Sequence, residues 1–285
     1  MPKVLQRLLV FFIGIPVVIA FILPELYYHL PLQLLIVLFS ALASWELSNM
    51  LSKKSPVNSK ILTLLFSITL PVVTYICILF KLDYVLIELT FALDVLILFA
   101  IEIFANKDFS NSNVKIANSI FVIFYSGFLP TFISRLTRFE HSVEVICVFV
   151  ILVFISDSAA WLFGMLFGKH NRGIIAASPN KSIAGFIGAF AGSICVAILL
   201  KFVLWKDIFG NNGMTRLIIL AICVTITSII GDLAESVFKR SSGCKDSGNI
   251  ILGRGGALDS IDSILASAPF YYIILKYIFD LTEKL

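Results

Sequence analysis

Residues 143–167 read VEVICVFVILVFISDSAAWLFGMLF, a run long enough to cross the apolar core of a bilayer as a helix. Its apolar side chains are continuous rather than alternating, so the run does not match a strand of a membrane β-barrel. A helix also satisfies every backbone N–H and C=O group internally, which a lipid environment requires. This run therefore predicts a membrane-spanning helix, and it carries an acidic residue, Asp157, in its interior.

The rest of the chain repeats this kind of run. Hydrophobic residues make up 59% of the 285 residues and charged residues 14%, whereas soluble proteins are nearer 45–50% and 25%. The composition excludes a disordered chain and argues against an ordinary soluble enzyme. We therefore predict an all-α, polytopic integral membrane protein with about nine transmembrane helices. The eight other expected spans are roughly 4–23, 30–50, 61–80, 84–104, 114–134, 183–205, 215–238 and 257–279.

The first of these runs resembles a signal peptide, because Lys3 and Arg7 precede it. No small-x-small cleavage site follows, and the run ends at Pro24 and Glu25. We expect it to be the first membrane helix. The five cysteines form no C-x-x-C pair and no Cys/His zinc pattern, so we expect no structural disulfide; four lie in apolar runs, and Cys244 is expected to be a loop thiol.

The positive charges are distributed unevenly between the expected loops. The net charge of +4 is too small to imply a nucleic-acid partner. With the N-terminus in the cytoplasm, 14 of the 22 Lys and Arg residues fall on the cytoplasmic side and 8 on the other, as the positive-inside rule favours. The loops 168–182 and 239–256 then share the cytoplasmic side. Both are basic and rich in Gly and Ser, which suggests an anionic ligand there.

Acidic residues inside membrane helices are costly and usually face a partner or a cavity. Glu88, Asp94 and Glu102 stand alone among apolar residues, and Glu46 lies beside Trp45 near a helix end. We interpret these four as structural, paired or interfacial carboxylates.

The carboxylates of the second half are clustered instead. Asp232 and Ser236 are spaced i, i+4 on one helical face, with Glu235 beside them, and Asp259 and Asp262 are spaced i, i+3 at the start of the last helix. Carboxylates gathered at one membrane surface repel one another unless a cation lies between them. Oxygen ligands without His or Cys favour Mg²⁺ or Mn²⁺. A proton or sodium site in a transporter is the alternative.

Basic residues and glycines lie close to these carboxylates. Lys239, Arg240 and Lys245 lie within 14 residues of Asp232 in the sequence. Residues 253–256 read GRGG and precede a helix N-terminus. Glycine allows a close backbone approach, and we expect free N–H groups at this N-terminus to bind phosphate. A divalent metal, Lys and Arg side chains and a glycine turn are the components of phosphoryl-transfer sites.

The earlier loop adds a second group of polar residues. Asp157, Trp161, Gly164 and Gly168 fall on one helical stripe, and glycines spaced by four predict close helix packing. Residues 178–182 read SPNKS, which resembles a capping sequence before the next helix and places Lys181 in the loop.

These motifs together resemble the phosphatidate cytidylyltransferase, or CDP-diacylglycerol synthase, family. Its signature, Ser-x-hydrophobic-Lys-Arg, four residues and Lys-Asp, matches SVFKRSSGCKD at 236–246. The signature continues with His-Gly-Gly and Asp-Arg-x-Asp, which read RGG at 254–256 and DSID at 259–262. Arg254 thus replaces the signature His, and Ser260 replaces an Arg. The resemblance covers residues 157–262 and extends beyond them by hydropathy alone.

The resemblance implies the transfer of CMP from CTP to phosphatidate, with CDP-diacylglycerol and pyrophosphate as products. It implies Mg²⁺, with a second, monovalent cation such as K⁺, and a homodimer embedded in membrane lipids. The metal ligands are expected to be Asp232, Ser236 and Asp259. The catalytic residues are expected to be Asp232, Asp259, Asp262, Lys239, Arg240 and Lys245. The substrate-binding residues are expected to be Asp157, Lys181, Ser182, Arg254, Gly255 and Gly256.

Residues 1–140 are accordingly expected to supply N-terminal transmembrane helices and residues 141–285 the transmembrane catalytic region, within one membrane domain. The expected location is a bacterial inner membrane, with the active site facing the cytoplasm. Two alternatives remain open: a CTP-dependent lipid kinase, which would transfer the γ-phosphate to a lipid alcohol, and a cation-coupled transporter. Motifs at helix ends on one side favour an interfacial enzyme over a transporter, which more often has broken mid-membrane helices.

Overall fold

A computed structural model describes residues 14–203, 208, 212–251 and 255–284. Within these residues the regular secondary structure is helical, and β-type pairing is limited to isolated bridges. Seven helical segments in this part of the chain are long and apolar enough to cross a membrane. The prediction of an all-α, polytopic membrane protein is confirmed.

Eight of the nine predicted spans overlap a helical segment over most of their length, and the described part of the span 4–23 is helical at Ile15–Ile22. The segments are α2 (Ile15–Ile22), α3 (Leu30–Leu51), α4 (Lys60–Leu79), α5 (Val85–Ala105), the continuous run of α6 (Ser112–Ile123), η2 (Phe124–Phe128) and α7 (Leu129–Leu136), α8 (Ser142–Phe167), α9 (Ile183–Val203), α10 (Gly213–Ser241), and α11 (Leu258–Ile273) with η3 (Ile274–Ile278). The segments α2 and α5 are not among the seven candidate spans. Residues 4–13 of the first expected helix lie outside the described residues, and α5 carries three acidic side chains.

The chain divides into two compact units. Unit 1 comprises residues 1–137 and 238–261, and unit 2 comprises residues 138–237 and 262–285. The chain first passes from unit 1 to unit 2 beside the expected boundary at residue 140. Two further crossings, within α10 and within α11, have no counterpart in the sequence-based division.

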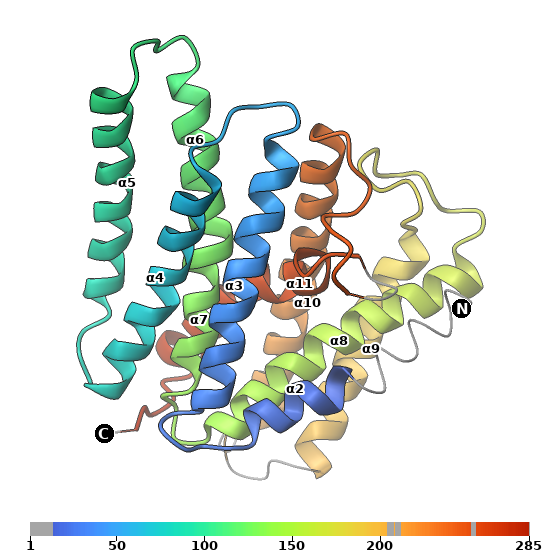
Figure 1. The fold of residues 1–285 in the computed structure, drawn as a ribbon. Coiled ribbons are helices and arrows are strands. Elements are labelled where there is room, and N and C mark those ends of the chain that lie inside the picture. The colour runs from blue at the N-terminus through green and yellow to red at the C-terminus, as the bar shows by residue number, and fades with distance from the viewer. Residues whose placement is uncertain (1–13, 204–207, 209–211, 252–254, 285) are drawn as a thin grey trace. The chain divides into compact units, whose positions relative to one another are not determined.

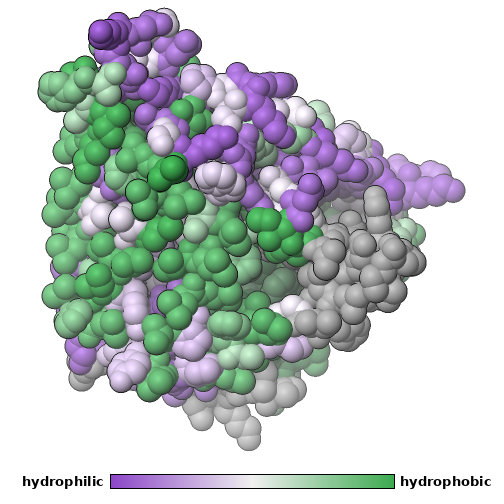
Figure 2. All heavy atoms as spheres, viewed as in Figure 1, coloured by the Kyte–Doolittle hydropathy of each residue, from purple (hydrophilic) through white to green (hydrophobic). Residues whose placement is uncertain are grey.

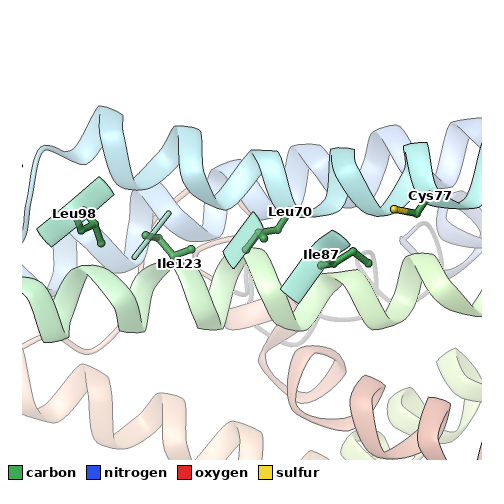
Figure 3. Close-up of a cluster of buried hydrophobic side chains, with 5 residues drawn as sticks. All are labelled: Leu70, Cys77, Ile87, Leu98 and Ile123. Atoms are coloured by element: carbon green, nitrogen blue, oxygen red, sulfur yellow. The ribbon is translucent and has the colours of Figure 1, made fainter. Parts of the chain in front are cut away.

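In unit 1, α4 packs between α3 and α5 (Figure 1). Figure 3 shows the apolar cluster that α4 and α5 build with α6, formed by the fully buried residues Leu70, Cys77, Ile87, Leu98 and Ile123. Lipid tails are as apolar as these side chains, so close packing rather than exclusion of water stabilises the cluster. Cys77 therefore behaves as the small apolar residue that the sequence predicts.

A seam of small polar residues joins α3, α4 and η2 within the same unit. The Ser40 hydroxyl donates to the Ser126 carbonyl oxygen at 2.5 Å, and the Ser67 hydroxyl donates to that of Ser44 at 3.1 Å. A Cβ on Gly127 would lie 2.7 Å from the Ser67 Cα, so this glycine is required for the helices to approach. Small residues and interhelical hydrogen bonds are the usual means of helix association in lipid.

The isolated acidic residues of α5 have partners within unit 1. Glu88 pairs with Arg135 at 3.0 Å and Glu102 with Lys115 at 2.8 Å, which confirms that these two carboxylates are paired. Asp94 is buried and accepts a long hydrogen bond, 3.5 Å, from the Thr69 hydroxyl.

The outer surface of α4 and α5 is suited to lipid. Leu89, Leu93, Leu96 and Ile103 are exposed along α5. Figure 2 shows apolar side chains over this part of the molecule, at the left of the view, and hydrophilic side chains where α5 joins α6. An exposed apolar helix face bordered by a polar loop is the pattern of a helix that lies against hydrocarbon.

In unit 2, α8 and α9 lie side by side and pack along their lengths (Figure 1). A Cβ on Gly185 would come 2.8 Å from the Ala160 carbonyl oxygen, and one on Gly164 would come 3.7 Å from the Gly185 Cα. The close helix packing predicted from the glycine spacing is confirmed for Gly164.

Candidate functional site

The carboxylate of Asp259 lies in unit 1 within a dense set of hydrogen-bond donors. One oxygen, Oδ1, accepts from the Lys239 ammonium at 2.6 Å. The other, Oδ2, accepts from the Ser247 N–H at 2.9 Å and from the Gly256 N–H at 2.8 Å, and the Ser247 hydroxyl lies 2.9 Å away. The Asp259 side chain is 6% exposed and that of Lys239 13%. Because both oxygens are held, the position of this carboxylate is set by the surrounding loop and helices.

A second carboxylate, Glu46 of α3, binds the N-terminus of α11. Its Oε1 accepts from the Ala257 N–H and its Oε2 from the Leu258 N–H, both at 2.9 Å. The Ser247 hydroxyl also lies 3.1 Å from Glu46 Oε2, which places it between Glu46 and Asp259. A negative charge at a helix N-terminus is stabilised by the helix dipole.

The glycines of the motif make room for these carboxylates. Gly255 has a φ of +111°, a conformation that residues with a side chain rarely adopt. A Cβ on Gly256 would collide with Glu46 Oε2 and with the Ser247 hydroxyl, and a Cβ on Gly248 would collide with Glu46 Oε1. The need for glycine here therefore has an explanation within the protein itself.

This arrangement changes one expectation. The N–H groups before and within the first turn of α11 are not free in the structure: Gly256 donates to Asp259, Ala257 and Leu258 donate to Glu46, and the Asp259 N–H donates to the Ser247 hydroxyl at 3.3 Å. The prediction that free N–H groups there bind phosphate is wrong for these four donors, because protein side chains occupy them. Whether Gly255 and Gly256 contact substrate stays a prediction.

The basic residues of the motif have different surroundings. Lys239 is bound to Asp259. Arg240 donates to the Cys244 carbonyl oxygen at 3.5 Å, and Lys245 is exposed. Cys244 lies in a loop, as expected, and its side chain is buried; the Lys53 ammonium lies 2.9 Å from its sulfur. Arg254 lies outside the described residues.

In unit 2, the Lys181 ammonium binds the Asp232 carboxylate directly. Lys181 belongs to the loop before α9, and Asp232 lies in α10, so the structure joins the two regions that the sequence singled out separately. The side chains are 23% and 36% exposed, respectively. Ser236, one helical turn beyond Asp232, is buried.

Three helices of unit 2 meet around Ser228 of α10. Its hydroxyl donates to Asp157 of α8 at 3.2 Å, and its carbonyl oxygen accepts from the Ser263 hydroxyl of α11 at 3.4 Å. One turn further along α10, a Cβ on Gly231 would lie 2.8 Å from the Asp262 carbonyl oxygen. Close contact of the helices therefore brings Asp262 beside the residue that precedes Asp232.

Ser182 has a structural explanation. It is buried, and its hydroxyl accepts from the Gly185 N–H at 3.1 Å, as a capping residue at the start of α9 does. Contact between Ser182 and substrate stays a prediction, whereas the capping role that the sequence suggested is present.

The expected metal ligands are divided between the units, with Asp232 and Ser236 in unit 2 and Asp259 in unit 1. Across the described ranges, no group of three or more His, Cys, Asp or Glu side chains lies close enough to hold a metal ion. Asp232 and Asp259 are each bound to a lysine. The metal site stays a prediction, supported so far by the oxygen-donor chemistry of these side chains.

Sequence reasoning did not assign Glu46 or Ser247 to the site. Glu46 lies more than 200 positions before the amides that it binds, so no local spacing connects them. Ser247 lies within the signature region, but the family pattern as quoted above does not specify it. Glu46 is the one charged residue of α3, and this isolated charge was the available signal.

The chain is similar to a protein family and to several curated proteins. The family model described as "Cytidylyltransferase family" matches residues 5–278. Among curated relatives, a phosphatidate cytidylyltransferase of Haemophilus influenzae is 36% identical over 156 residues, which is 54% of each protein. One of Staphylococcus haemolyticus is 41% identical over 125 residues, 44% of this chain and 46% of the relative. One of Staphylococcus saprophyticus is 37% identical over 139 residues, 49% and 51%.

The aligned stretches thus span about half the length of these relatives. The family model, in contrast, extends from the first expected helix through η3 and includes both groups of site residues. On this match the chain belongs to the cytidylyltransferase family.

Proposed function

We propose that this integral membrane protein is a phosphatidate cytidylyltransferase, which transfers CMP from CTP to phosphatidate. The curated relatives carry this name. The observation that carries the proposal is the signature at residues 236–262, in which the structure pairs Lys239 with Asp259 and surrounds that carboxylate with donors. Such a positioned, charged group is what phosphoryl-transfer chemistry requires.

The proposed reaction is an attack of one polyanion on another. A phosphate oxygen of phosphatidate forms a bond to the α-phosphorus of CTP, and the bond from that phosphorus to the oxygen bridging to the β-phosphorus breaks. Pyrophosphate leaves, and CDP-diacylglycerol remains in the membrane. The attacking phosphate is already ionised, so a strong general base is not needed, and the barrier is mainly electrostatic.

The basic residues lower this barrier in the proposal. Lys239 and Arg240 at the end of α10, the exposed Lys245 and Lys181 before α9 would bind phosphate oxygens. Arg254 would add a planar guanidinium with several N–H donors suited to phosphate. Asp157, Ser182, Gly255 and Gly256 would line the substrate site, and Asp262 would orient a basic side chain or act as a further ligand.

We also propose that Mg²⁺ is the cofactor, held by Asp232, Ser236 and Asp259. These residues offer oxygen donors, which Mg²⁺ prefers. The bound ion would supply positive charge beside the triphosphate and the departing pyrophosphate. Lys181 and Lys239, which bind the two aspartates in the structure, would then be available to phosphate. A second cation such as K⁺ and a homodimer rest on the family resemblance.

The reaction can be tested with purified protein in mixed micelles. With phosphatidate, Mg²⁺ and CTP labelled at the α-phosphate, we expect labelled CDP-diacylglycerol and an equal amount of pyrophosphate. Diacylglycerol and CTP labelled at the γ-phosphate form the matched control. Labelled phospholipid in the control, without CDP-lipid in the first reaction, would identify a lipid kinase and overturn the proposal.

The protein is further proposed to lie in a bacterial inner membrane, with loops 168–182 and 239–256 facing the cytoplasm. The uneven distribution of Lys and Arg supports this orientation. In a background with Cys195 and Cys244 replaced by serine, we expect Asn180→Cys and Asn249→Cys to react with a membrane-impermeant thiol reagent from the cytoplasmic side. Both asparagines are exposed. Labelling of the two positions from opposite sides would rule out a shared active site.

A further inference from the structure

We propose that Glu46 is a positioning residue, which holds the N-terminus of α11 and thereby places Asp259 for catalysis. The inference rests on the proposed function, because Asp259 acts in the reaction proposed above. Glu46 belongs to α3, outside the signature region, and it is 4% exposed.

Glu46 binds consecutive backbone amides with its two separate oxygens. Ala257 N–H donates to Oε1 and Leu258 N–H donates to Oε2, each at 2.9 Å. A single bond would leave the carboxylate free to rotate, whereas two bonds to adjacent amides fix the direction in which the helix begins. Hydrogen bonds to an ionised acceptor are stronger than neutral ones, and the charge also interacts favourably with the helix dipole.

The amides bound by Glu46 directly follow a backbone donor to the Asp259 carboxylate. Gly256, the residue before Ala257, donates its N–H to Asp259 Oδ2 at 2.8 Å. The Ser247 hydroxyl lies 3.1 Å from Glu46 Oε2 and 2.9 Å from Asp259 Oδ2. A displacement of Glu46 would therefore move a backbone donor and a hydroxyl that both contact Asp259.

An ordinary helix cap would not need this construction. Helices are usually capped by a nearby Ser, Thr, Asp or Asn, and Ser182 does this for α9. The N-terminus of α11 instead uses a buried carboxylate from α3, a helix with no other charged residue. The backbone is shaped to receive it, because a Cβ on either Gly248 or Gly256 would collide with its oxygens.

Glu102 of α5 offers a matched comparison within the same unit. It is also a buried glutamate at 4% exposure, but its partners are the side chains of Asn106, Ser112 and Lys115. None of these three belongs to the proposed site. Loss of the Glu102 charge tests the general cost of removing a buried carboxylate, whereas loss of the Glu46 charge tests its effect on Asp259.

The experiment measures kcat, and KM for CTP, for folded Glu46→Gln, Glu46→Asp and Glu102→Gln in mixed micelles. In Glu46→Gln we expect kcat to fall about 10–100-fold, the scale of loss that follows from misplacing a reacting group by about 1 Å, with a smaller change in KM. Glu46→Asp retains the charge and should recover part of kcat. Glu102→Gln should turn over at the parent rate per folded molecule.

Hydrogen exchange of the amides at 257–258 provides a readout that does not depend on activity. Exchange should be faster in Glu46→Gln than in the parent or Glu102→Gln. If the parent makes no CDP-diacylglycerol while this difference is present, the proposed function fails and the hold of Glu46 on α11 stands. Parent-like kcat in folded Glu46→Gln overturns the positioning role. Should that variant not fold, Glu46→Asp decides the question: faster exchange at 257–258 together with a parent-like kcat overturns the positioning role.

Discussion

The two lysine–aspartate pairs of this protein have the same chemistry but different surroundings. In unit 1, Asp259 is 6% exposed and binds Lys239, the Ser247 N–H and the Gly256 N–H. In unit 2, the Asp232 side chain is 36% exposed and binds Lys181. The first carboxylate is held by a lysine of α10 and by backbone amides of the following loop, whereas the second is bound by the side chain of one lysine.

Because the two pairs differ in burial, we expect them to differ in their contribution to stability, although both are proposed to act in catalysis. Removing one member of a buried pair leaves the other charge without its partner and is strongly destabilising. A more exposed pair contributes little to stability, because water solvates both members when they separate. We therefore expect Asp259 to matter for folding and for turnover, and Asp232 mainly for turnover.

The variant Asp259→Asn should lose both activity and stability. We expect the free energy of unfolding to fall by about 3–5 kcal/mol, because the buried Lys239 ammonium loses its carboxylate. Unfolding in mixed micelles and CDP-diacylglycerol formation measure the two effects. A free energy of unfolding equal to that of the parent would contradict the contrast between the pairs.

The variant Asp232→Asn should lose activity while remaining folded. Loss of one positioned electrostatic group typically lowers kcat by about 100–1000-fold. The free energy of unfolding should change by less than about 1 kcal/mol, since the pair with Lys181 is partly exposed. The same two assays apply. Near-normal turnover in saturating Mg²⁺ would remove Asp232 from the proposed metal ligands.

The lysines allow the contrast to be tested from the other partner. Lys181→Met should lower kcat/KM about 10–150-fold, the equivalent of a charge-assisted hydrogen bond of about 1.5–3 kcal/mol. Its stability should remain near that of the parent. Lys239→Met should lower the free energy of unfolding as well, because Asp259 is the more buried carboxylate. Equal stability losses in the two variants would show that the difference in burial has no energetic consequence.

The smallest effect is expected for Ser247→Ala. Removal of this hydroxyl takes away one contact to Asp259 and one to Glu46, which is worth about 1 kcal/mol. Activity should fall by less than about tenfold, as judged by initial rates. Ser260→Ala is the control, because its hydroxyl donates to the Gly256 carbonyl oxygen within its own helix turn. A larger loss of activity in Ser260→Ala than in Ser247→Ala would show that the backbone of the helix turn matters more than the Ser247 contacts.

The helices were predictable because the solvent constrains them strongly. In hydrocarbon, each apolar run of sufficient length has to satisfy its own backbone, so length and composition define a helix such as α8 without knowledge of its neighbours. The spacing of Gly164 also predicted close packing, since a missing Cβ is a local property that any neighbouring helix can use. The candidate residues of the signature were identifiable because they lie close together in the sequence, within residues 236–262.

The sequence by itself therefore determined the all-α membrane fold, the positions of the spans and the chemical types at the candidate site. Only the tertiary structure decided which charge meets which: Lys239 with Asp259, Lys181 with Asp232, and Glu46 with the amides of α11. The amides that we expected to be free for phosphate instead donate to the carboxylates of Glu46 and Asp259. Helix formation in lipid depends on local chain chemistry, whereas these partners lie up to 212 positions apart and meet only when the helices pack.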